Sequence, residues 1–468
     1  MRTPMTCYRD KSQADLPSAD RRRVLIGAMA AGIITLVPGV RAATGTGELD
    51  PRIAAFRQRK FGMFVHWGPY SQASVEASWP IMEPTPKWPI SEKNYVGLAR
   101  TFNPTAFDPD ALVELARSTG QKYMVFTTKH HDGFCMFDSM YTDYKITNSP
   151  YGKDIVRMLS DACARHDLPL GFYYSPPDLH HPGFRDTSKP ASTNWGGEPQ
   201  RPEWASYLGY MELQLSELLG RYGPVETIWF DGLHHQEKYD GQRFIDLIRH
   251  LQPMATVNDR IGTVGDYVTP EQFTPNRIPT KGVPFAGTDE RVQDRLVQGV
   301  PDPDSFQDWE TCMTINNTWA YNSRDHEFKS ARDLIRTAVE VFSRGGNFLL
   351  NIGPKPDGTI PTEFRERLGA IGNWMAANGE SVYGTTYGPI QGQRGYRTTA
   401  KDGDLFVHIL DMPPGRLTLP DWGRKVGAVR LLADKRPLNF IQSGTGVDID
   451  LTGIIPDPAV TVLEVYVT

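Results

Sequence analysis

Polar and aromatic residues gather where five short apolar stretches of the chain end. These clusters are His66-Trp67-Gly68, Lys129-His130-His131-Asp132-Gly133, Tyr173-Tyr174-Ser175, Trp229-Phe230-Asp231-Gly232 and Asn258-Asp259-Arg260. Imidazole, carboxylate and guanidinium groups serve acid–base and nucleophilic catalysis and bind hydroxyl groups. A single histidine at a strand end is more often structural. Five such clusters in succession indicate instead that their side chains share one pocket.

Asp231 is the strongest candidate for a catalytic group. It follows the apolar run Thr227–Phe230, so its carboxylate would lie partly desolvated at the end of a buried strand. A carboxylate that acts as a nucleophile must stay ionised, and it therefore needs cations or hydrogen-bond donors beside it. The alternative is that Asp231 only caps the element that follows. The candidates for the neighbouring donors are His66, His130, His131 and Arg260.

The paired histidines also suit a metal ion. His130 and His131 precede Asp132, and His234 and His235 form a second pair. Neighbouring residues of a strand point to opposite faces, which argues against two adjacent histidines on one ion. The chain has neither an HxH nor an HExxH pattern. A metallohydrolase is therefore the less favoured alternative.

The elements that must position these residues follow from the hydrophobic pattern. The apolar stretches read as strands buried on both faces of a parallel sheet, and the helical patterns between them include one with Asp108 as N-cap and Pro109 as first residue. This alternation predicts a (β/α)8-like barrel, in which active sites lie at the C-terminal ends of the strands. The expected strands are Phe61–Trp67, Tyr123–Lys129, Leu168–Ser175, Thr227–Phe230, Ala255–Asn258 and Asn347–Ile352, and the expected helices are Asp108–Ser118, Trp204–Leu219 and Ala331–Ser343.

The pattern changes after about residue 385. Strand-like segments at 404–410, 428–433 and 459–467 follow one another without helices between them. They predict a C-terminal β-sandwich at 386–468 after a catalytic barrel at 50–385. Two long polar loops, Pro176–Trp204 and Gln272–Asp308, would have a functional meaning if they follow strand ends of the barrel.

The first 43 residues have the pattern of an export signal. Three arginines, at positions 21–23, precede an apolar run at 24–40, and Ala42 and Ala43 offer a cleavage site. Paired arginines directly before the run favour the twin-arginine route. We therefore expect an exported protein, periplasmic or extracellular, without stable membrane insertion after signal removal. The alternative is an uncleaved membrane anchor.

Composition limits the partners. A formal net charge of −5 and a pI of about 6.1 give no attraction to nucleic acid or to anionic membranes. Aromatic residues make up 11% of the chain, which suits a carbohydrate partner as well as a large core. Cys135, Cys163 and Cys312 are expected to be buried thiols, because their wide spacing suits neither a disulfide framework nor a zinc site. The alternative is a single disulfide between two of them. The composition leaves open whether the protein forms a homo-oligomer.

Several stretches together resemble glycoside hydrolase family 29, the α-L-fucosidases. They are FGMFVHWGPYS, KYMVFTTKHHDGFCMFDS, YGPVETIWFDG, WETCMTINNTWAY and GGNFLLNIGPKPDGTIP, in this order, and the resemblance runs from about residue 56 to 385. It implies a (β/α)-type barrel followed by a β-sandwich. It also implies an exo-acting enzyme that hydrolyses terminal α-linked L-fucose of an oligosaccharide or glycoconjugate with retention of configuration, without a metal or cofactor.

The resemblance also implies roles for single residues. Asp231 matches the nucleophile, and the general acid/base is expected at Glu310, in DWETCMTIN, with Glu271, in GDYVTPEQ, as second choice. The acid needs a pKa raised by burial or by the charge of the nucleophile. The positions implied to hold the sugar or line its pocket are His66, Glu76, Trp79, His130, His131, Tyr174, Trp229, Arg260 and Trp319.

Two departures from the family pattern bear on the substrate. An acidic residue usually adjoins the tryptophan after the first strand, but here Glu76 and Trp79 are separated by Ala77 and Ser78. Ala320 stands where a glycine is usual. A related sugar such as L-galactose, which adds one hydroxyl to fucose, is therefore an alternative substrate. A catalytically silent sugar-binding protein is the alternative from another functional class.

Overall fold

The computed structural model describes residues 49–88, 90–232, 234–281 and 303–468. The export signal that we predict at residues 1–43 lies outside these residues. These described residues belong to one compact unit. Within the described part of the chain, no helix is both long and apolar enough to cross a membrane.

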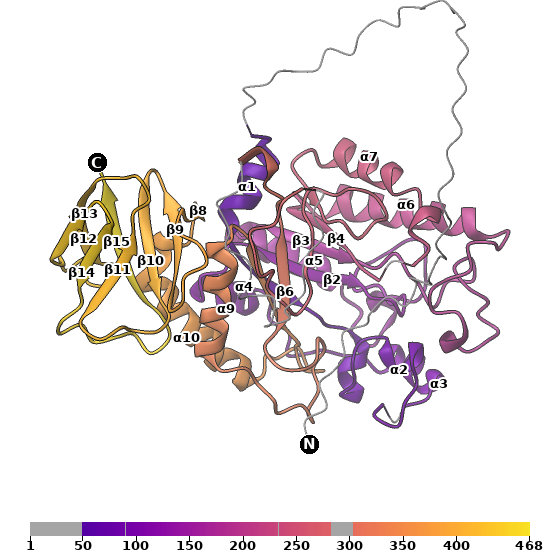
Figure 1. Cartoon of the computed structure of the whole chain (residues 1–468). Coiled ribbons are helices and arrows are strands. Elements are labelled where there is room, and N and C mark those ends of the chain that lie inside the picture. Colours follow the sequence, from indigo (N-terminus) through magenta and orange to yellow (C-terminus); the bar gives the residue numbers. More distant parts are fainter. Residues whose placement is uncertain (1–48, 89, 233, 282–302) are drawn as a thin grey trace, which may run out of the picture. The chain divides into compact units, whose positions relative to one another are not determined.

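Seven parallel strands form the central sheet, in the order β5-β4-β3-β2-β1-β7-β6. Figure 1 labels β2, β3, β4 and β6 of this sheet. Every residue in these strands is buried, as expected where both faces of a sheet are covered. The strands are β1 Phe61–Val65, β2 Met124–Lys129, β3 Leu170–Tyr174, β4 Thr227–Phe230, β5 Thr256–Val257, β6 Glu310–Thr314 and β7 Asn347–Ile352.

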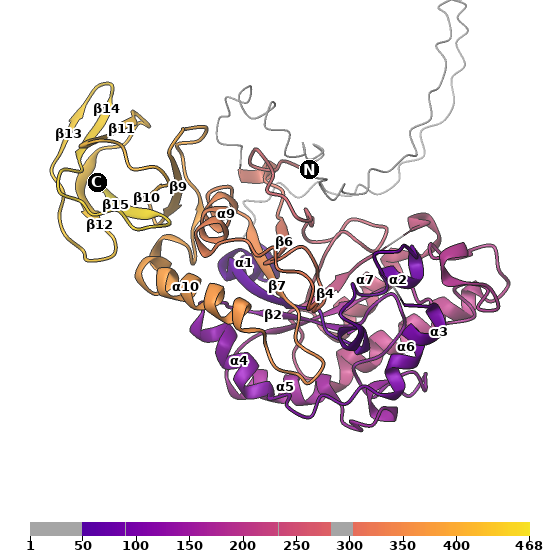
Figure 2. The same cartoon turned by 90° about the horizontal axis from the view of Figure 1, so that it is seen from below.

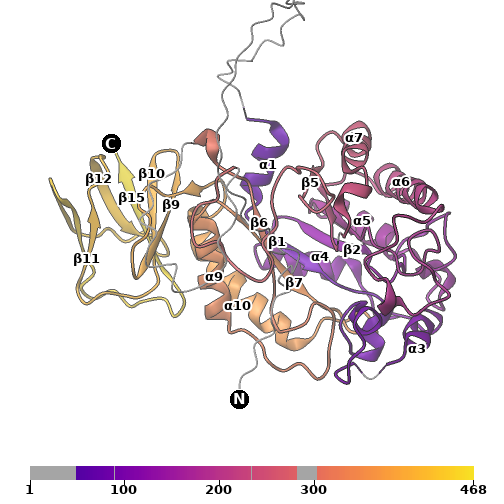
Figure 3. The same cartoon turned by 45° about the vertical axis from the view of Figure 1, so that its right-hand side comes forward.

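Helices connect most of these strands and lie along the outside of the sheet (Figures 2 and 3). Five of the described helices begin at side-chain caps, which are Asp50, Ser91, Asp108, Asp154 and Ser330. For example, Asp108 accepts from Ala111 N at 3.0 Å and Asp154 from Arg157 N at 2.8 Å. The described helices are α1 Pro51–Arg59, α2 Trp79–Met82, α3 Glu92–Gly97, α4 Pro109–Ser118, α5 Ile155–Arg165, α6 Trp204–Arg221, α7 Gly241–Leu251, α9 Ala331–Ser343 and α10 Thr362–Asn378.

Residues 266–272 fill the space between the two edge strands, β5 and β6. Asp266 N donates to Val257 O of β5 at 2.7 Å. On the other side, Glu310 N donates to Val268 O and Gln272 N donates to Cys312 O, both at 2.9 Å. These bonds satisfy the edges and close the barrel as an eighth strand would. The described chain between β5 and residue 281 forms no helix, so this unit lacks the usual strand–helix alternation.

The predicted (β/α)8-like barrel and its six predicted strands are confirmed. β6 was missed, because ETCMT is a polar stretch with neither an apolar run nor an alternating pattern. Glu310 is therefore the first residue of a strand. Cys135, Cys163 and Cys312 are free and buried, as predicted.

Two antiparallel sheets follow the barrel. One has the order β12-β15-β10-β9-β8 and the other β11-β14-β13. They share an apolar core that includes Leu405, Val407, Leu417, Val447 and Leu463, which makes them the predicted sandwich. The strands are β8 Thr386–Tyr387, β9 Tyr396–Lys401, β10 Asp404–Ile409, β11 Arg416–Pro420, β12 Val426–Leu431, β13 Phe440–Ser443, β14 Gly446–Asp450 and β15 Thr461–Val467.

The barrel and the sandwich are joined by direct contacts. Trp374 Nε1 of α10 donates to Val460 O at 2.9 Å, and Arg397 of β9 pairs with Glu340 of α9 at 2.7 Å. One apolar cluster also contains residues of both parts, such as Phe406 of β10. The division of the chain near residue 385 therefore stays a prediction.

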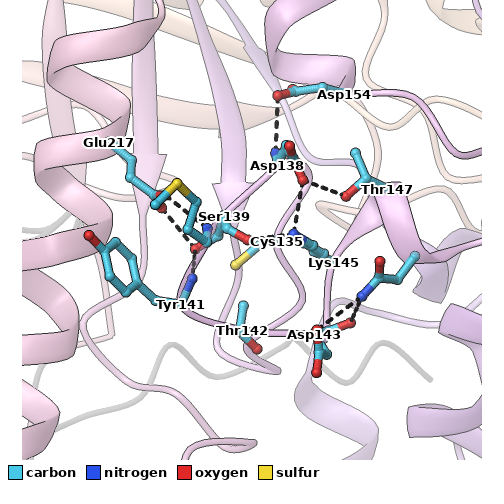
Figure 4. A network of polar contacts seen from close by, with 12 residues as sticks. Cys135, Asp138, Ser139, Tyr141, Thr142, Asp143, Lys145, Thr147, Asp154 and Glu217 are labelled. Atoms are coloured by element: carbon cyan, nitrogen blue, oxygen red, sulfur yellow. Dashed lines mark hydrogen bonds and ion pairs between the residues drawn. The ribbon is translucent and has the colours of Figure 1, made fainter.

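A polar network holds the long connection from β2 to α5 (Figure 4). Asp138 Oδ1 accepts from Lys145 Nζ at 2.9 Å, and Asp138 N donates to Asp154 Oδ2 at 3.0 Å. Glu217 of α6 accepts from Ser139 Oγ at 2.9 Å. These bonds fix the backbone that follows the two histidines at the end of β2.

Candidate active site

Asp231 directly follows β4 at the mouth of the barrel. Its Oδ1 accepts from Arg260 Nη1 at 2.6 Å and its Oδ2 from the Tyr173 hydroxyl at 2.9 Å, and His131 Nε2 lies 3.7 Å from Oδ2. Burial by itself would raise the pKa of Asp231, but the charge of Arg260 and the hydrogen bonds from Arg260 and Tyr173 outweigh burial, so the pKa is lowered. Asp231 is thus held ionised and does not cap a helix.

Arg260 connects Asp231 to Glu271. The same nitrogen, Nη1, donates to Glu271 Oε2 at 3.0 Å, so this oxygen and Asp231 Oδ1 lie no farther apart than about 5.6 Å. The guanidinium is fixed by bonds from Nε and Nη2 to the hydroxyl and carbonyl of Thr269, at 2.8 and 3.0 Å, and lies 4.9 Å from the centre of the Trp229 ring. At this spacing one carboxylate can attack a carbon atom while the other donates a proton.

Glu310 lies at the opposite end of the barrel. It is the first residue of β6 and pairs with Asn347, the first residue of β7. Its Oε1 accepts from Trp229 Nε1 at 3.0 Å and its Oε2 from the Tyr123 hydroxyl. Glu310 is 1% exposed, whereas the Glu271 side chain is 41% exposed. A carboxyl enclosed beneath Trp229 does not reach a ligand at the mouth, so the structure brings Glu271, and not our first choice, to Asp231.

His66, His130 and His131 line the same mouth. His130 and His131 lie beyond the last residue of β2, so the alternation of a strand does not apply to them. Their rings turn to the same side, and the ring centroids are 4.2 Å apart. Our expectation that these neighbours point to opposite faces was therefore wrong. Burial lowers the pKa of His66 and of His131 to about 4, and that of His130 well below its usual value. All three imidazoles are neutral at pH 7.

Nitrogen and oxygen atoms of His130, His131 and Asp231 lie within 4.8 Å of one another, a set that resembles a metal site. The guanidinium of Arg260 is already bonded to Asp231 at 2.6 Å, and its positive charge would repel a metal ion at this place. The geometry thus favours the guanidinium of Arg260 over a metal ion as the cationic partner of Asp231. The absence of a metal stays a prediction.

Tyr173 enters the pocket, and we correct the prediction of Tyr174 accordingly. Successive residues of a strand point to opposite sides. Tyr173 bonds Asp231, whereas the Tyr174 hydroxyl donates outward to Gln214 Oε1 of α6 at 2.9 Å. Both faces of β3 are buried and apolar. The sequence therefore indicates that one of these two tyrosines lies in the pocket, but not which one.

Glu76 supports the pocket indirectly. It is buried and accepts hydrogen bonds from Trp319 N at 2.8 Å and Ala320 N at 3.0 Å. Burial raises its pKa to about 7, although these bonds oppose the rise. The Trp319 ring in turn lies 5.0 Å from the ring of His66. Glu76 therefore positions the tryptophan that we predicted, and Ala320 contributes a backbone donor.

Three aromatic rings meet in the connections that follow β1, β3 and β4. The Trp79 ring lies 6.1 Å from that of Trp195, and the Trp195 ring lies 4.3 Å from that of His234. Trp79 adjoins Ser78, whose hydroxyl bonds His130 at 2.7 Å. Trp195 was not predicted, although its position in the long loop Pro176–Trp204 was a signal. We call these three residues the aromatic rim.

Comparisons with known proteins agree on one family. A family model described as Alpha-L-fucosidase matches residues 44–380. Plasma alpha-L-fucosidase of Homo sapiens is 29% identical, over 85% of this chain and 85% of that protein. The structure of alpha-L-fucosidase isoenzyme 1 from Paenibacillus thiaminolyticus is 34% identical, with a TM-score of 0.77 over 89% of this chain and 99% of that one.

The structure of a third relative contains a trapped reaction intermediate. It is an alpha-L-fucosidase GH29 from Bacteroides thetaiotaomicron, solved as a trapped covalent intermediate in complex with 2-fluoro-fucosyl fluoride by means of a glutamate-to-glutamine mutant. It is 26% identical to this chain, with a TM-score of 0.74 over 92% of this chain and 100% of that one.

The position of Glu310 predicts a pH-dependent stability. Its pKa is about 7 in the folded protein and near 4.5 in the unfolded chain, so between these values the folded state binds more protons and stability falls as pH rises. The parent protein should lose up to about 3 kcal/mol of its free energy of unfolding between pH 5 and pH 8 because of this group. Glu310→Gln has no carboxyl to titrate and should not show this loss. Denaturant unfolding at both pH values measures it. An unchanged pH dependence in Glu310→Gln would contradict a raised pKa of Glu310 in the folded protein.

Proposed function

The chain belongs to the alpha-L-fucosidase family, glycoside hydrolase family 29, and from this premise we propose that it hydrolyses terminal α-linked L-fucose with retention, through a covalent glycosyl-enzyme on Asp231. The observation that carries the proposal is the spacing of Asp231 and Glu271, at most about 5.6 Å between the oxygens that share Arg260. Retaining glycosidases have carboxyl groups about 5 to 5.5 Å apart, whereas inverting ones need about 6.5 to 9.5 Å. The trapped covalent intermediate of the Bacteroides relative supports the same chemistry.

In the first step, a carboxylate oxygen of Asp231 attacks C1 of the fucose. The bond from C1 to the leaving oxygen breaks, and Glu271 gives its proton to that oxygen. Arg260 and the Tyr173 hydroxyl hold the two carboxylate oxygens of Asp231 in position for the attack. The charge of Arg260 also keeps the nucleophile ionised in its buried surroundings.

In the second step, Glu271 takes a proton from water, and the resulting hydroxide equivalent attacks C1. The bond between C1 and Asp231 breaks, and L-fucose leaves with its original configuration. Our preference between the two candidate acids is therefore reversed: Glu271 is the acid/base. Glu310 serves as a buried hydrogen-bond acceptor for Trp229 and Tyr123.

We propose that the sugar lies between the three histidines and Trp319, and that the leaving group is itself a sugar. The aromatic rim offers ring faces, and its Trp79 directly follows Ser78, whose hydroxyl bonds His130. Carbohydrate rings pack on such faces through their C–H groups. A fucosylated oligosaccharide or glycoconjugate fits this arrangement. A pocket that only binds sugar is less favoured, because a charge-paired nucleophile and a second carboxylate at reacting distance have no use in it.

The organisation of the whole chain is part of the proposal. Residues 1–43 direct export by the twin-arginine route, residues 50–385 carry catalysis, and residues 386–468 form the sandwich that packs on α9 and α10.

Asp231→Ala should lower kcat on an aryl α-L-fucoside by at least about 10³-fold, because no covalent intermediate can form. Azide should restore turnover by attacking C1 from the vacated side, which yields the β-L-fucosyl azide. Chelator should leave the native activity unchanged. Full activity of Asp231→Ala would disprove the nucleophile, and an activity lost to chelator and restored by a metal would favour a metallohydrolase.

Glu271→Ala should separate substrates by their leaving groups. Cleavage of a fucosylated disaccharide should fall by about 10² to 10⁴-fold, while bond cleavage in a dinitrophenyl fucoside, whose leaving group needs no proton, should change little. Azide should here give the α-L-fucosyl azide, since it attacks the glycosyl-enzyme. Glu310→Gln is the matched control and should keep the native ratio between the two substrates. The reverse result would restore Glu310 as the acid.

Trp195→Ala should weaken only the recognition of the leaving group. We expect kcat/KM for a fucosylated disaccharide to fall by roughly 3- to 10-fold, as for one lost aromatic contact, and that for α-L-fucosyl fluoride to stay unchanged. Trp422→Ala, at a half-buried tryptophan of the sandwich, should alter neither rate constant. Equal losses on both substrates in Trp195→Ala would contradict a role in binding the leaving sugar.

A further inference from the structure

We infer that Ser78, Ser175 and Asn351 fix the tautomers of the three pocket histidines, so that the mouth of the barrel offers a sugar one imidazole N–H donor and two imidazole acceptors. The identity of the sugar rests on the proposed function, whereas the tautomers rest only on the hydrogen-bond network of the described residues. Ser78, Ser175 and Asn351 are positioning residues in this scheme, because they act through the histidines that they bond.

His130 is held as the tautomer with its proton on Nε2. Its Nδ1 lies 2.7 Å from Ser78 Oγ, and the same oxygen accepts from Asp132 N at 2.9 Å. Among the described residues, His130 Nδ1 is the acceptor that remains for the hydroxyl proton of Ser78, which is fully buried. Nδ1 therefore accepts, and the neutral ring carries its proton on Nε2.

The backbone of Ser78 is held for this contact. Its φ of 59° lies in the left-handed region, which residues other than glycine seldom adopt. Ser78 N donates to the Tyr95 hydroxyl at 2.7 Å, and that hydroxyl donates to Asp132 Oδ2 at 2.9 Å. These two bonds join Ser78 to the turn after His130 and His131.

His131 is held as the opposite tautomer. Its Nδ1 lies 2.6 Å from Ser175 Oγ, and the Ser175 hydroxyl donates to Pro177 O at 2.6 Å. A carbonyl oxygen only accepts, so the hydroxyl proton is used there and Ser175 can only accept from His131. Nδ1–H is therefore the donor, and Nε2 of the neutral ring keeps a free lone pair.

His66 has the same tautomer as His131. Its Nδ1 lies 2.7 Å from Asn351 Oδ1, and Asn351 Nδ2 donates to Trp319 O at 2.7 Å. The carbonyl of Trp319 fixes which end of the amide is the donor, so the amide oxygen must face His66. His66 therefore donates from Nδ1 and presents an unprotonated Nε2.

The second nitrogen of each ring is free to bind a ligand. Within the described part of the chain no hydrogen bond engages Nε2 of His66, His130 or His131, and His131 Nε2 is 3.7 Å from Asp231. None of them is among the buried nitrogens and oxygens without a partner, so each reaches solvent. Two sugar hydroxyls must therefore donate, to His66 and His131, and one must accept, from His130.

Nitrogen NMR of the full-length protein labelled with ¹⁵N-histidine tests the tautomers directly. The protonated and unprotonated ring nitrogens differ in chemical shift, and His66→Gln, His130→Gln and His131→Gln each identify one ring by the loss of its signals. We expect a proton on Nδ1 of His66 and His131 and on Nε2 of His130. One common tautomer for all three rings would overturn the inference.

Two serine variants test the cause. Ser78→Ala should release the preference of His130 and weaken inhibition by L-fucose by roughly 3- to 10-fold, the effect of one hydrogen bond. Ser160→Ala is the matched control, because Ser160 of α5 is also buried and its hydroxyl has no partner among the described residues. It should change neither the histidine spectrum nor the inhibition. An unchanged His130 tautomer in Ser78→Ala would show that Ser78 does not set it.

Deoxy and deoxyfluoro analogues of L-fucose test the consequence, since fluorine can accept but cannot donate. Used as competitive inhibitors, the two analogues should be equally weak at the two donating positions, whereas fluorine should bind better than hydrogen at the accepting one. Fluorine that restores binding at every position would overturn the inference.

If the protein cleaves no fucoside but the NMR result holds, only the proposed function is contradicted. If it cleaves fucosides with one common tautomer, the inference fails alone.

Discussion

The bond between Arg260 and Asp231 is the interaction on which the rest of the site depends. A carboxylate at the mouth of an apolar barrel loses solvation, and burial favours its neutral form, which cannot act as a nucleophile. The guanidinium reverses this preference at 2.6 Å, and through the same nitrogen it holds Glu271. Removing one partner of such a pair leaves an uncompensated charge, at a cost of about 3 to 5 kcal/mol. The two bonds to Thr269 and the Trp229 ring keep the guanidinium in place.

An irregularity of the barrel brings Glu271 to this pair. β5 is only two residues long, and residues 266–272 continue the wall of the barrel without a helix. Backbone bonds to β5 and β6 on either side satisfy this segment, so it is as well anchored as a strand. Thr269 and Glu271 both belong to it, which means that one segment both fixes the guanidinium and supplies the second carboxylate.

Neutral histidines complete the site. Burial holds the pKa of all three below neutrality, so the positive charge beside Asp231 comes from Arg260 alone among the described residues in contact with it. A charged imidazole at His131 would compete for the nucleophile, whereas a neutral ring orients a sugar without altering the charge balance. The residues behind the rings then decide which nitrogen meets the ligand.

The sequence by itself determined the fold class and most of the pocket. Buried apolar runs alternate with capped helices, and the C-terminal ends of parallel strands meet at one mouth, so Asp231, Arg260 and the three histidines could be grouped before any coordinate was known. Only the tertiary structure decided between Tyr173 and Tyr174 and between Glu271 and Glu310. A strand buried on both faces carries no alternating pattern, so the direction of each tyrosine depends on pairing with its neighbours. The end of the barrel that a glutamate occupies depends on where its strand begins, and the polar stretch at 310–314 gives no local signal of that point.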